Sequence, residues 1–166
     1  MKLLILVRHA KSSWADESLD DKDRPLNERG KKDAPVMAKR LRKKGIEIDL
    51  FLSSPAKRAR RTARYFAEAY KRSKNDVVIS DKLYDADPDN FFEVVQGLDD
   101  KIDSVAIFSH NPGITLFANM LTSVKVDNLP TCAVFAVQIN SDKWSELRNA
   151  SKDFLFFDYP KNPVGG

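Results

Sequence analysis

The chain has 166 residues, enough for one domain of ordinary size and too few for two full ones. Hydrophobic residues make up 42% and charged residues 31%, which indicates a packed core with a well-solvated surface and excludes a disordered chain. Its single cysteine, Cys132, excludes a disulfide-stapled scaffold. The apolar run at residues 3–7 is too short for a signal-peptide core or a membrane span, so we expect a cytoplasmic protein that uses no membrane.

The net charge of +4 is unevenly distributed along the chain. Residues 39–72 carry 12 basic and 3 acidic side chains, whereas residues 73–166 carry 8 basic and 14 acidic ones. A basic middle predicts an anionic partner on that side, although a solvated helix face explains the same pattern. Binding of nucleic acid is disfavoured, because the basic runs lack interleaved exposed aromatic side chains for base stacking.

A buried strand opens the predicted order of elements. Residues 2–7 form an aliphatic run, typical of a strand that is covered on both faces in a parallel sheet. Residues 10–26, rich in serine and aspartate, predict a loop. A helix follows over residues 27–44, with Asn27 as its N-cap, and Pro35 should kink or restart it.

The middle of the chain continues the alternation of strand and helix. Residues 48–53 predict a second strand, and Ser54 and Pro55 start a helix whose apolar stripe follows the helical period. A short strand over residues 77–80 and a helix over residues 89–98 come next.

A third pair of elements leads into the C-terminal part. Residues 104–109 predict another buried strand, and Asn111 opens a helix that runs to about Leu121. Residues 133–139 predict a strand, and residues 144–149 are expected to pair with it as a hairpin.

The end of the chain is aromatic at first and then rich in proline and glycine. The aromatic cluster at residues 154–159 is expected to pack on the sheet, and residues from about 160 to 166 to form a loose tail. The alternating elements predict a single α/β domain over residues 1–166, a sandwich with a mainly parallel sheet.

The only two histidines, His9 and His110, each follow directly after a predicted buried strand. In open α/β sheets, ligands bind beyond the carboxyl ends of the strands, so both lie where a site is expected. Arg8 and Arg58 belong to the same strand ends, and two arginines with two imidazoles form a pocket for a dianion. The helix opened by Asn111 would add substrate-binding N–H groups. A two-histidine metal site is disfavoured, because arginines oppose a cation.

Four motifs in this order resemble the histidine phosphatase (phosphoglycerate-mutase-like) superfamily. They are Arg-His-Ala at 8–10, Arg-Pro-Leu-Asn-Glu-Arg-Gly at 24–30, Ser-Ser-Pro-Ala-Lys-Arg-Ala at 53–59 and Ser-His-Asn-Pro-Gly at 109–113. The short length and the continuation after the first motif are most similar to the SixA-type phosphohistidine phosphatase branch. The resemblance covers roughly residues 1–122, and it implies a phosphoglycerate-mutase-like fold, a three-layer α/β/α sandwich.

The resemblance also implies a covalent mechanism. His9 would be the nucleophile that becomes transiently phosphorylated. Arg8, Arg58 and His110 would hold the phosphoryl oxygens and stabilise the charge of the transition state. Arg24 resembles a further substrate-contacting arginine of the short members. Neither a metal nor another cofactor is needed, because the arginines supply the positive charge.

The chain leaves no room for the helical lid that carries an acidic proton donor in larger members. Only 42 residues separate Thr62 from Val105, and a helix end, a strand and another helix already use them. Asp85 is a substitute general acid on one interpretation and an ordinary turn aspartate on the other. Phosphohistidine needs no dedicated acid, because imidazole is a better leaving group than an alkoxide.

We therefore predict a metal-independent phosphatase that acts on phosphohistidine in proteins. The resemblance makes a phosphorelay histidine domain one possible substrate. The first alternative is a small-molecule phosphomonoesterase with Asp85 as general acid. The second is a non-catalytic module that binds a phosphoprotein or a nucleic acid. The sequence does not indicate an oligomeric state.

Overall fold

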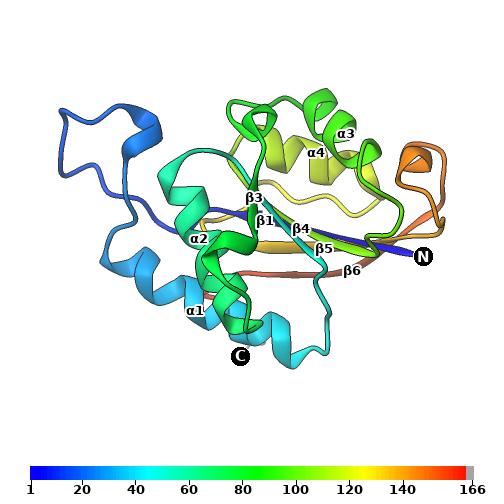
Figure 1. The fold of residues 1–166 in the computed structure, drawn as a ribbon, viewed down its shortest axis with the longest axis horizontal. Helices are drawn as coiled ribbons and strands as arrows, with labels where there is room; N and C mark the ends of the chain where they lie inside the picture. Colours follow the sequence, from blue (N-terminus) through cyan, green and yellow to red (C-terminus); the bar gives the residue numbers. More distant parts are fainter. Residues whose placement is uncertain (164–166) are drawn as a thin grey trace.

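The computed structural model describes residues 1–163, and within them one six-stranded sheet runs through the centre of the protein (Figure 1). The strands lie in the order β3-β2-β4-β1-β5-β6. Four neighbouring strands are parallel: β3 (Val77–Ile79), β2 (Leu50–Ser53), β4 (Ser104–Ser109) and β1 (Lys2–Arg8). The sheet is completed by two antiparallel pairings, of β5 (Val134–Ile139) with β1 and of β6 (Lys152–Asp158) with β5.

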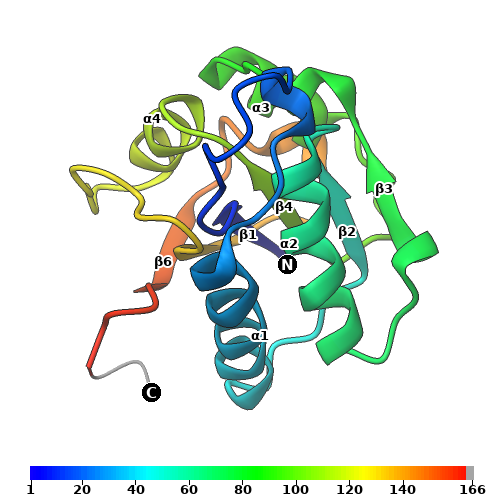
Figure 2. The same ribbon diagram turned by 90° about the vertical axis from the view of Figure 1, so that its left-hand side faces the viewer.

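Helices cover both faces of the sheet. On one face lie α1 (Glu28–Lys43) and α2 (Lys57–Ala69), and on the other α3 (Pro88–Gln96) and α4 (Gly113–Leu121) (Figures 1 and 2). Each helical layer buries its own apolar cluster against the sheet. The predicted three-layer α/β/α sandwich with a mainly parallel sheet is therefore confirmed, and no helical lid is inserted between α2 and β4.

The two central strands are aliphatic because side chains on both of their faces are covered. β4 is buried along its whole length, and β1 along most of it. They pair in parallel from Leu3 opposite Ser104 to Arg8 opposite Ser109. In the neighbouring pair, Ser53 of β2 lies opposite Phe108. This register brings the carboxyl ends of the three strands to one edge of the sheet.

The helix α1 begins as the sequence predicts and continues where it was expected to break. The Asn27 side chain accepts a hydrogen bond of 2.9 Å from the Gly30 N–H, which caps the first turn. Pro35 lies inside a helix that continues to Lys43, so the expected restart is wrong. Proline removes one hydrogen bond there, but burial of Met37 and its apolar neighbours against the sheet holds the helix together.

Two helix starts differ from the sequence prediction. α2 begins at Lys57 rather than at Ser54, and Ala56 takes the N-cap position. The Ser54 hydroxyl accepts from the Ala56 N–H at 3.1 Å and also bonds the ring of His110. α3 begins at Pro88, and Asp87 caps it, one residue earlier than expected. Reciprocal hydrogen bonds between Asp87 and Asn90 make the cap, and proline suits the first helical position.

The hairpin partner of β5 also differs. Residues 144–149 were expected to pair with it, but Trp144–Glu146 forms a short 3₁₀ turn with a fully buried indole. β6 is the partner, and it contains the aromatic cluster that was expected only to pack on the sheet. Its phenylalanines contact Phe135 of β5, so apolar packing selects this pairing.

The last described residues are held rather than loose. Arg40 donates hydrogen bonds to the carbonyls of Tyr159 and Pro160, and the Asn162 amide donates to Asp158 at 3.1 Å. The loose tail expected from about residue 160 therefore does not begin there. The rest of that expectation falls on residues 164–166, which lie outside the described residues.

A tight backbone contact of Gly30 generates the first prediction. A Cβ at this position would lie 2.2 Å from the carbonyl oxygen of Lys11, just beyond β1. Gly30→Ala should therefore push α1 away from this segment and destabilise the protein by about 2 kcal/mol. Gly97→Ala is the matched control, because its Cβ would meet nothing closer than 3.4 Å. Urea unfolding compares them, and equal stability of the two variants would contradict the prediction.

Candidate active site

Four of the predicted site residues come together at the carboxyl edge of the sheet. Arg8 ends β1, His9 follows it, His110 follows β4, and Arg58 lies in the first turn of α2. The imidazole centroids of His9 and His110 are 5.1 Å apart. Arg58, His9 and His110 expose only 6%, 7% and 9% of their surface, so these polar groups are largely withdrawn from water. Such burial of charged and ionisable groups requires specific partners.

The hydrogen bonds of His9 fix its tautomer. Its Nδ1 lies 2.7 Å from the carbonyl oxygen of Ala10. A carbonyl oxygen can only accept, so Nδ1 carries the proton and Nε2 keeps its lone pair. The Ala10 N–H donates to Thr62 Oγ1 at 2.9 Å, and Thr62 donates to the carbonyl of Arg58 at 2.8 Å. Thr62 thus ties the end of β1 to α2 and holds His9 beside Arg58.

His9 is uncharged at neutral pH. Burial lowers its pKa from 6.5 to about 3, and electrostatic interactions with His110, Arg58 and Arg8 act in the same direction. The hydrogen bond to Ala10 raises the pKa but does not outweigh these effects. A neutral imidazole with a free Nε2 is the form in which histidine can attack phosphorus.

His110 resembles His9 in its electrostatics. A hydrogen bond of 2.7 Å joins its Nε2 to the Ser54 hydroxyl. Burial, and then the charge of Arg58, lowers its pKa to about 3. Its Nδ1 is buried and lacks a hydrogen-bond partner among residues 1–163. Nδ1 is therefore available to bind a ligand.

Unpartnered nitrogen atoms concentrate at this site. Among the described residues, the buried side-chain atoms without a hydrogen-bond partner include Arg8 Nε, Arg24 Nε and Nη1, Arg58 Nε and His110 Nδ1. Buried polar groups are almost always hydrogen-bonded, so a group of unpaired donors marks a place where an acceptor-rich ligand binds. Three guanidinium groups with an imidazole suit a phosphoryl group. We call Arg8, Arg24 and Arg58 the arginine cluster.

Arg8 is anchored through the segment before β5. Its Nη1 donates to the carbonyl oxygen of Leu129 at 2.9 Å, and the Asn111 amide donates to the same oxygen at 3.0 Å. The Asn111 carbonyl oxygen accepts from Thr115 at 2.6 Å. The prediction that Asn111 binds substrate concerned the N–H groups at the start of its helix, and it stays a prediction. The side-chain amide of Asn111 is engaged at both ends by the protein itself. In this structure it positions the carbonyl that orients Arg8.

Arg24 lies in the site although it comes from a loop. It exposes 7% of its surface, its guanidinium stacks 3.4 Å from the ring centroid of Trp14, and it donates to Ser12 Oγ at 2.7 Å. A strand-like bridge between Ser12 and Leu26 closes the base of this loop, which projects beyond the end of the sheet (Figure 1). The fold of the loop therefore places Arg24 at the site.

The sequence analysis missed an acidic residue of the site, Asp21. One of its carboxylate oxygens accepts from Arg58 Nη2 at 2.9 Å and from the Tyr84 hydroxyl at 2.5 Å. The other lies 3.6 Å from Arg24 Nε. The only hint in the sequence is that Asp21 precedes Arg24 by three residues. Tyr84 was missed as well, although it directly precedes Asp85, and its ring meets His110 edge-on.

Asp85 does not join the site in this structure. It is exposed, its backbone adopts φ 52°, and no side-chain hydrogen bond or ion pair joins it to another described residue. The turn places the neighbouring Tyr84 toward the arginine cluster instead. The buried Cys132 is equally remote from nucleophilic chemistry, because burial raises the pKa of its thiol.

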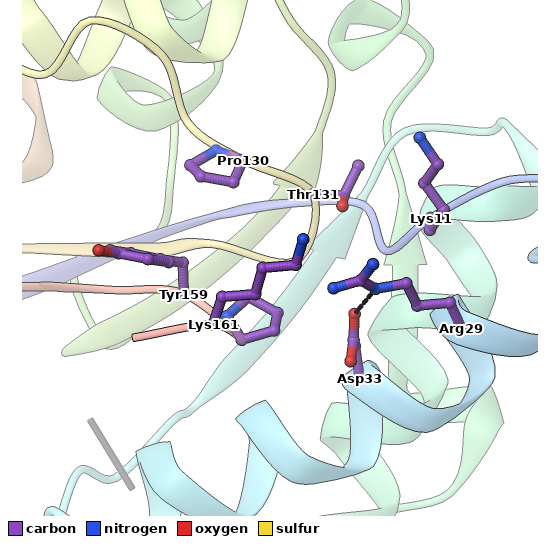
Figure 3. A pocket seen from close by; sticks show the side chains of 8 residues that line it. Lys11, Arg29, Asp33, Pro130, Thr131, Tyr159 and Lys161 are labelled. Carbon is purple, nitrogen blue, oxygen red and sulfur yellow. Dashed lines mark ion pairs between the residues drawn. The ribbon is translucent and has the colours of Figure 1, made fainter. Parts of the chain in front are cut away.

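A separate cavity of about 300 Å³ lies between the start of α1 and the segments that follow β1 and β6 (Figure 3). Lys11, Arg29 and Lys161 line it, and Arg29 is paired with Asp33 at 3.5 Å. Residues of the arginine cluster do not line this cavity. No group of three or more potential metal-ligating histidine, cysteine or carboxylate side chains occurs among residues 1–163, nor a helix long and apolar enough to cross a membrane.

Comparison with known proteins identifies the family of the chain. The sequence model of the histidine phosphatase superfamily (branch 1) matches residues 4–92, which include Arg8, His9, Arg24 and Arg58. The chain belongs to this superfamily. An uncharacterised chloroplastic protein of Arabidopsis thaliana is 32% identical over 151 residues, which cover 86% of this chain and 69% of that protein.

Two further relatives differ in what they act on. Phosphoserine phosphatase 1 of Hydrogenobacter thermophilus is 41% identical over 92 residues, which cover 52% of this chain and 40% of that protein. The protein histidine phosphatase SixA, solved as a complex with tungstate, superimposes with a TM-score of 0.81 at 20% identity and covers 95% of this chain and 97% of its own. At that identity the likeness establishes the shared fold.

The low pKa values of the two histidines can be measured directly. The chain contains two histidines, so their imidazole NMR signals can be assigned by single substitutions. Because both pKa values lie near 3, neither ring should titrate between pH 8 and pH 5, and His9 should show a protonated Nδ1. A midpoint near 6.5 for either ring would contradict this.

The same shifts determine how stability depends on pH. Unfolded histidine takes up a proton below about pH 6.5, whereas the folded rings do so only near pH 3. The free energy of unfolding contributed by the two rings should therefore fall as the pH drops from about 6.5 toward 3. Urea unfolding at several pH values checks the sign.

The anchoring of Arg8 generates another prediction. Asn111→Ala should lower kcat/KM for phosphate release about tenfold. Without the Asn111 amide, the Leu129 carbonyl that orients Arg8 is held less firmly. Asn119→Ala is the matched control, since Asn119 makes a similar pair of hydrogen bonds, to Val126, away from Arg8. Both variants should lose comparable stability, and equal activity of the two would refute the positioning role.

Proposed function

We propose that this member of the superfamily is a metal-independent phosphatase that acts on phosphohistidine in proteins through a covalent intermediate on His9. The observation that carries the proposal is the neutral His9, whose Nε2 lone pair is free beside the unpaired donors of the arginine cluster. A nucleophile and a site for the oxygens of a phosphoryl group thus lie together.

The reaction would proceed in two displacements at phosphorus. His9 Nε2 attacks in line, a new N–P bond forms, and the bond from phosphorus to the substrate nitrogen breaks. Arg8, Arg58 and Arg24, with His110 Nδ1, bind the phosphoryl oxygens while their charge rearranges. The released imidazole takes a proton from solvent. Water then attacks the phosphorylated His9, phosphate leaves, and Nε2 regains its lone pair.

The choice of phosphohistidine rests on proton donors. An alkoxide leaving group needs a general acid, whereas a phosphorylated imidazole can leave neutral after protonation by water. Asp85 makes no side-chain hydrogen bond in the described part of the chain. Asp21 is close, but its pKa lies below the ordinary value: hydrogen bonds from Tyr84 and Arg58 and the charge of Arg24 outweigh the opposing effect of burial. Asp21 is therefore ionised at neutral pH and is not a proton donor there.

A protein substrate suits the surroundings of the site. The chain has no helical lid, and basic side chains of α1 and α2 continue from the loop that carries Arg24. Lys31, Lys57 and Arg61 line a cavity of about 190 Å³ beside Pro25. Such a surface favours the approach of an acidic phosphoprotein, of which a phosphorelay histidine domain is one example. The SixA relative of the same fold is described as a protein histidine phosphatase, and tungstate, which it was solved with, is an oxyanion.

The second candidate function is a small-molecule phosphomonoesterase. The observation in its favour is the relative described as a phosphoserine phosphatase, which is 41% identical over about half of this chain. It would require a general acid, and Asp85 would have to approach the site on substrate binding. The two functions differ in the leaving group, so their substrates distinguish them.

The proposed function predicts a specific pattern of turnover. Wild-type protein should release phosphate from a phosphohistidine peptide in the presence of EDTA, faster than from p-nitrophenyl phosphate. His9→Ala should lose roughly a thousandfold or more of this activity, because the nucleophile is gone. Phosphate release measured side by side on both substrates is the test.

The covalent intermediate has its own control within the chain. With only two histidines present, brief reaction of His110→Ala with a labelled phosphohistidine peptide should leave an acid-labile label on His9. Preference for the ester, with loss of activity in Asp85→Asn, would favour the phosphomonoesterase. Turnover that depends on added metal, or that persists in His9→Ala, would contradict the proposed mechanism.

A further inference from the structure

The carboxylate of Asp21 occupies a position where an anion is expected. Arg58 donates to it through Nη2 at 2.9 Å, and Arg24 Nε lies 3.6 Å from its other oxygen. Arg58 Nη1 also donates to the Asp21 main-chain carbonyl at 2.6 Å. Two members of the arginine cluster thus have an internal acidic partner.

Tyr84 completes this arrangement from the opposite side of the site. Its hydroxyl donates to the Asp21 carboxylate at 2.5 Å, while its ring contacts His110, with centroids 5.6 Å apart. The acidic partner raises the pKa of the Tyr84 hydroxyl. Asp21 therefore lies between Arg58, Arg24 and Tyr84, next to the imidazole that faces His9.

Within the proposed function, a carboxylate and a phosphoryl group are alternative partners of the same guanidinium groups. A carboxylate is planar and a phosphoryl group is tetrahedral, but both are oxyanions that accept paired N–H hydrogen bonds from arginine. A phosphoryl dianion has more charge and more acceptor oxygens than one carboxylate. It also reaches donors that Asp21 leaves unpaired, such as Arg58 Nε and His110 Nδ1.

We propose that Asp21 is an internal competitor: an anion that occupies Arg58 and Arg24 and is exchanged for the phosphoryl group of the substrate. This rests on the proposed function, because it assumes that phosphate binds to the arginine cluster. The competition lowers the affinity of the arginine cluster for phosphate, so the product phosphate is released more easily.

The exchange is feasible because Asp21 is only partly buried. Its side chain is 48% exposed, whereas that of Arg58 is 8% exposed. The carboxylate can therefore turn into water at small cost, while Arg58 stays in the site. The main-chain carbonyl of Asp21 can keep its hydrogen bond to Arg58 Nη1 throughout.

Two other roles for Asp21 predict a different effect on binding. If the carboxylate merely held Arg58 in a productive orientation, its removal would weaken phosphate binding. If it were a general acid, its removal would lower kcat on esters with little change in affinity for phosphate. An internal competitor makes the protein bind phosphate better when it is removed, by more than the gain from one fewer negative charge that Asp23→Asn reports.

The test is the binding of inorganic phosphate at pH 7.5, measured by calorimetry for wild type, Asp21→Asn and Asp23→Asn. Asp23→Asn is the matched control: it lies in the same 3₁₀ turn (Asp21–Asp23) and makes the same change of charge, but it forms no side-chain hydrogen bond or ion pair with a described residue. Asp21→Asn should bind phosphate roughly fivefold more tightly, a size set by the partial exposure of the ion pair, and Asp23→Asn should bind like wild type.

Tyr84→Phe provides a second variant that keeps the ring against His110. Without the hydroxyl, Asp21 is held less firmly, so phosphate should bind more tightly than in wild type and less tightly than in Asp21→Asn. Turnover of the phosphohistidine peptide should show the same order in KM and in inhibition by phosphate.

The outcomes separate this inference from the proposed function. Tighter binding in Asp21→Asn and, to a smaller degree, in Tyr84→Phe, but not in Asp23→Asn, supports the exchange. Unchanged or weaker binding in Asp21→Asn, with phosphate still bound and turnover still dependent on His9, overturns the exchange and leaves the proposed function standing. Absence of phosphate binding and of turnover in all variants overturns both.

Discussion

The crowding of positive charge around two uncharged imidazoles is the constraint on which the candidate site depends. Burial lowers the pKa of Arg8, and the neighbouring charge of Arg58 lowers it further. Such repulsion is tolerated only where the chain fixes each group. The carbonyl of Leu129 holds Arg8, and that of Asp21 holds Arg58. Burial, assisted by the same positive charges, keeps His9 and His110 neutral, so the anion site and the nucleophile depend on the same buried cluster.

The parts of the site differ in how firmly they are held. His9 and His110 extend directly from β1 and β4, which pair in register and are buried on both faces. The Cys132 N–H lies 3.0 Å from the carbonyls of Arg8 and His9, which closes the end of β1 against the segment before β5. Arg24 and Asp21, in contrast, come from one projecting loop. The proposed exchange requires that His9 stay fixed while Asp21 can move, and the placement of Asp21 on a loop meets this requirement.

Close backbone approaches explain why two of the motifs end in glycine. At Gly113 an added Cβ would lie 1.9 Å from the carbonyl oxygen of Ala86, and at Gly30 it would meet Lys11. The first contact packs the start of α4 under the turn that carries Tyr84. The second packs the start of α1 under the segment that follows His9. Each glycine therefore positions a neighbour of the site without touching a substrate.

The sequence by itself determined the layers, the mainly parallel sheet and four residues of the candidate site, because these depend on local patterns. Aliphatic runs define β1 and β4, and chemistry at the ends of parallel strands meets at one edge of the sheet, so His9, Arg8, Arg58 and His110 could be predicted together. Helix starts were less predictable: Ser54 has the chemistry of a cap, but Ala56 takes the N-cap position, and the Ser54 hydroxyl also bonds His110 from across the sheet edge. The partner of β5 depended on packing with Phe135, which local alternation does not record.

Only the tertiary structure decided which polar side chains share the site. Asp21, Tyr84 and Asp85 are equally plausible by residue type, and their separation in sequence gives no indication of contact. The fold of the loop before Arg24 brings Asp21 to Arg58, 37 positions further along the chain, and the turn after β3 points Tyr84 inward while it leaves Asp85 exposed. The engagement of Asn111 by Leu129 and Thr115 was hidden for the same reason. Contacts between distant segments are set by the packing of the whole chain, whereas strands and helices follow the period of their own residues.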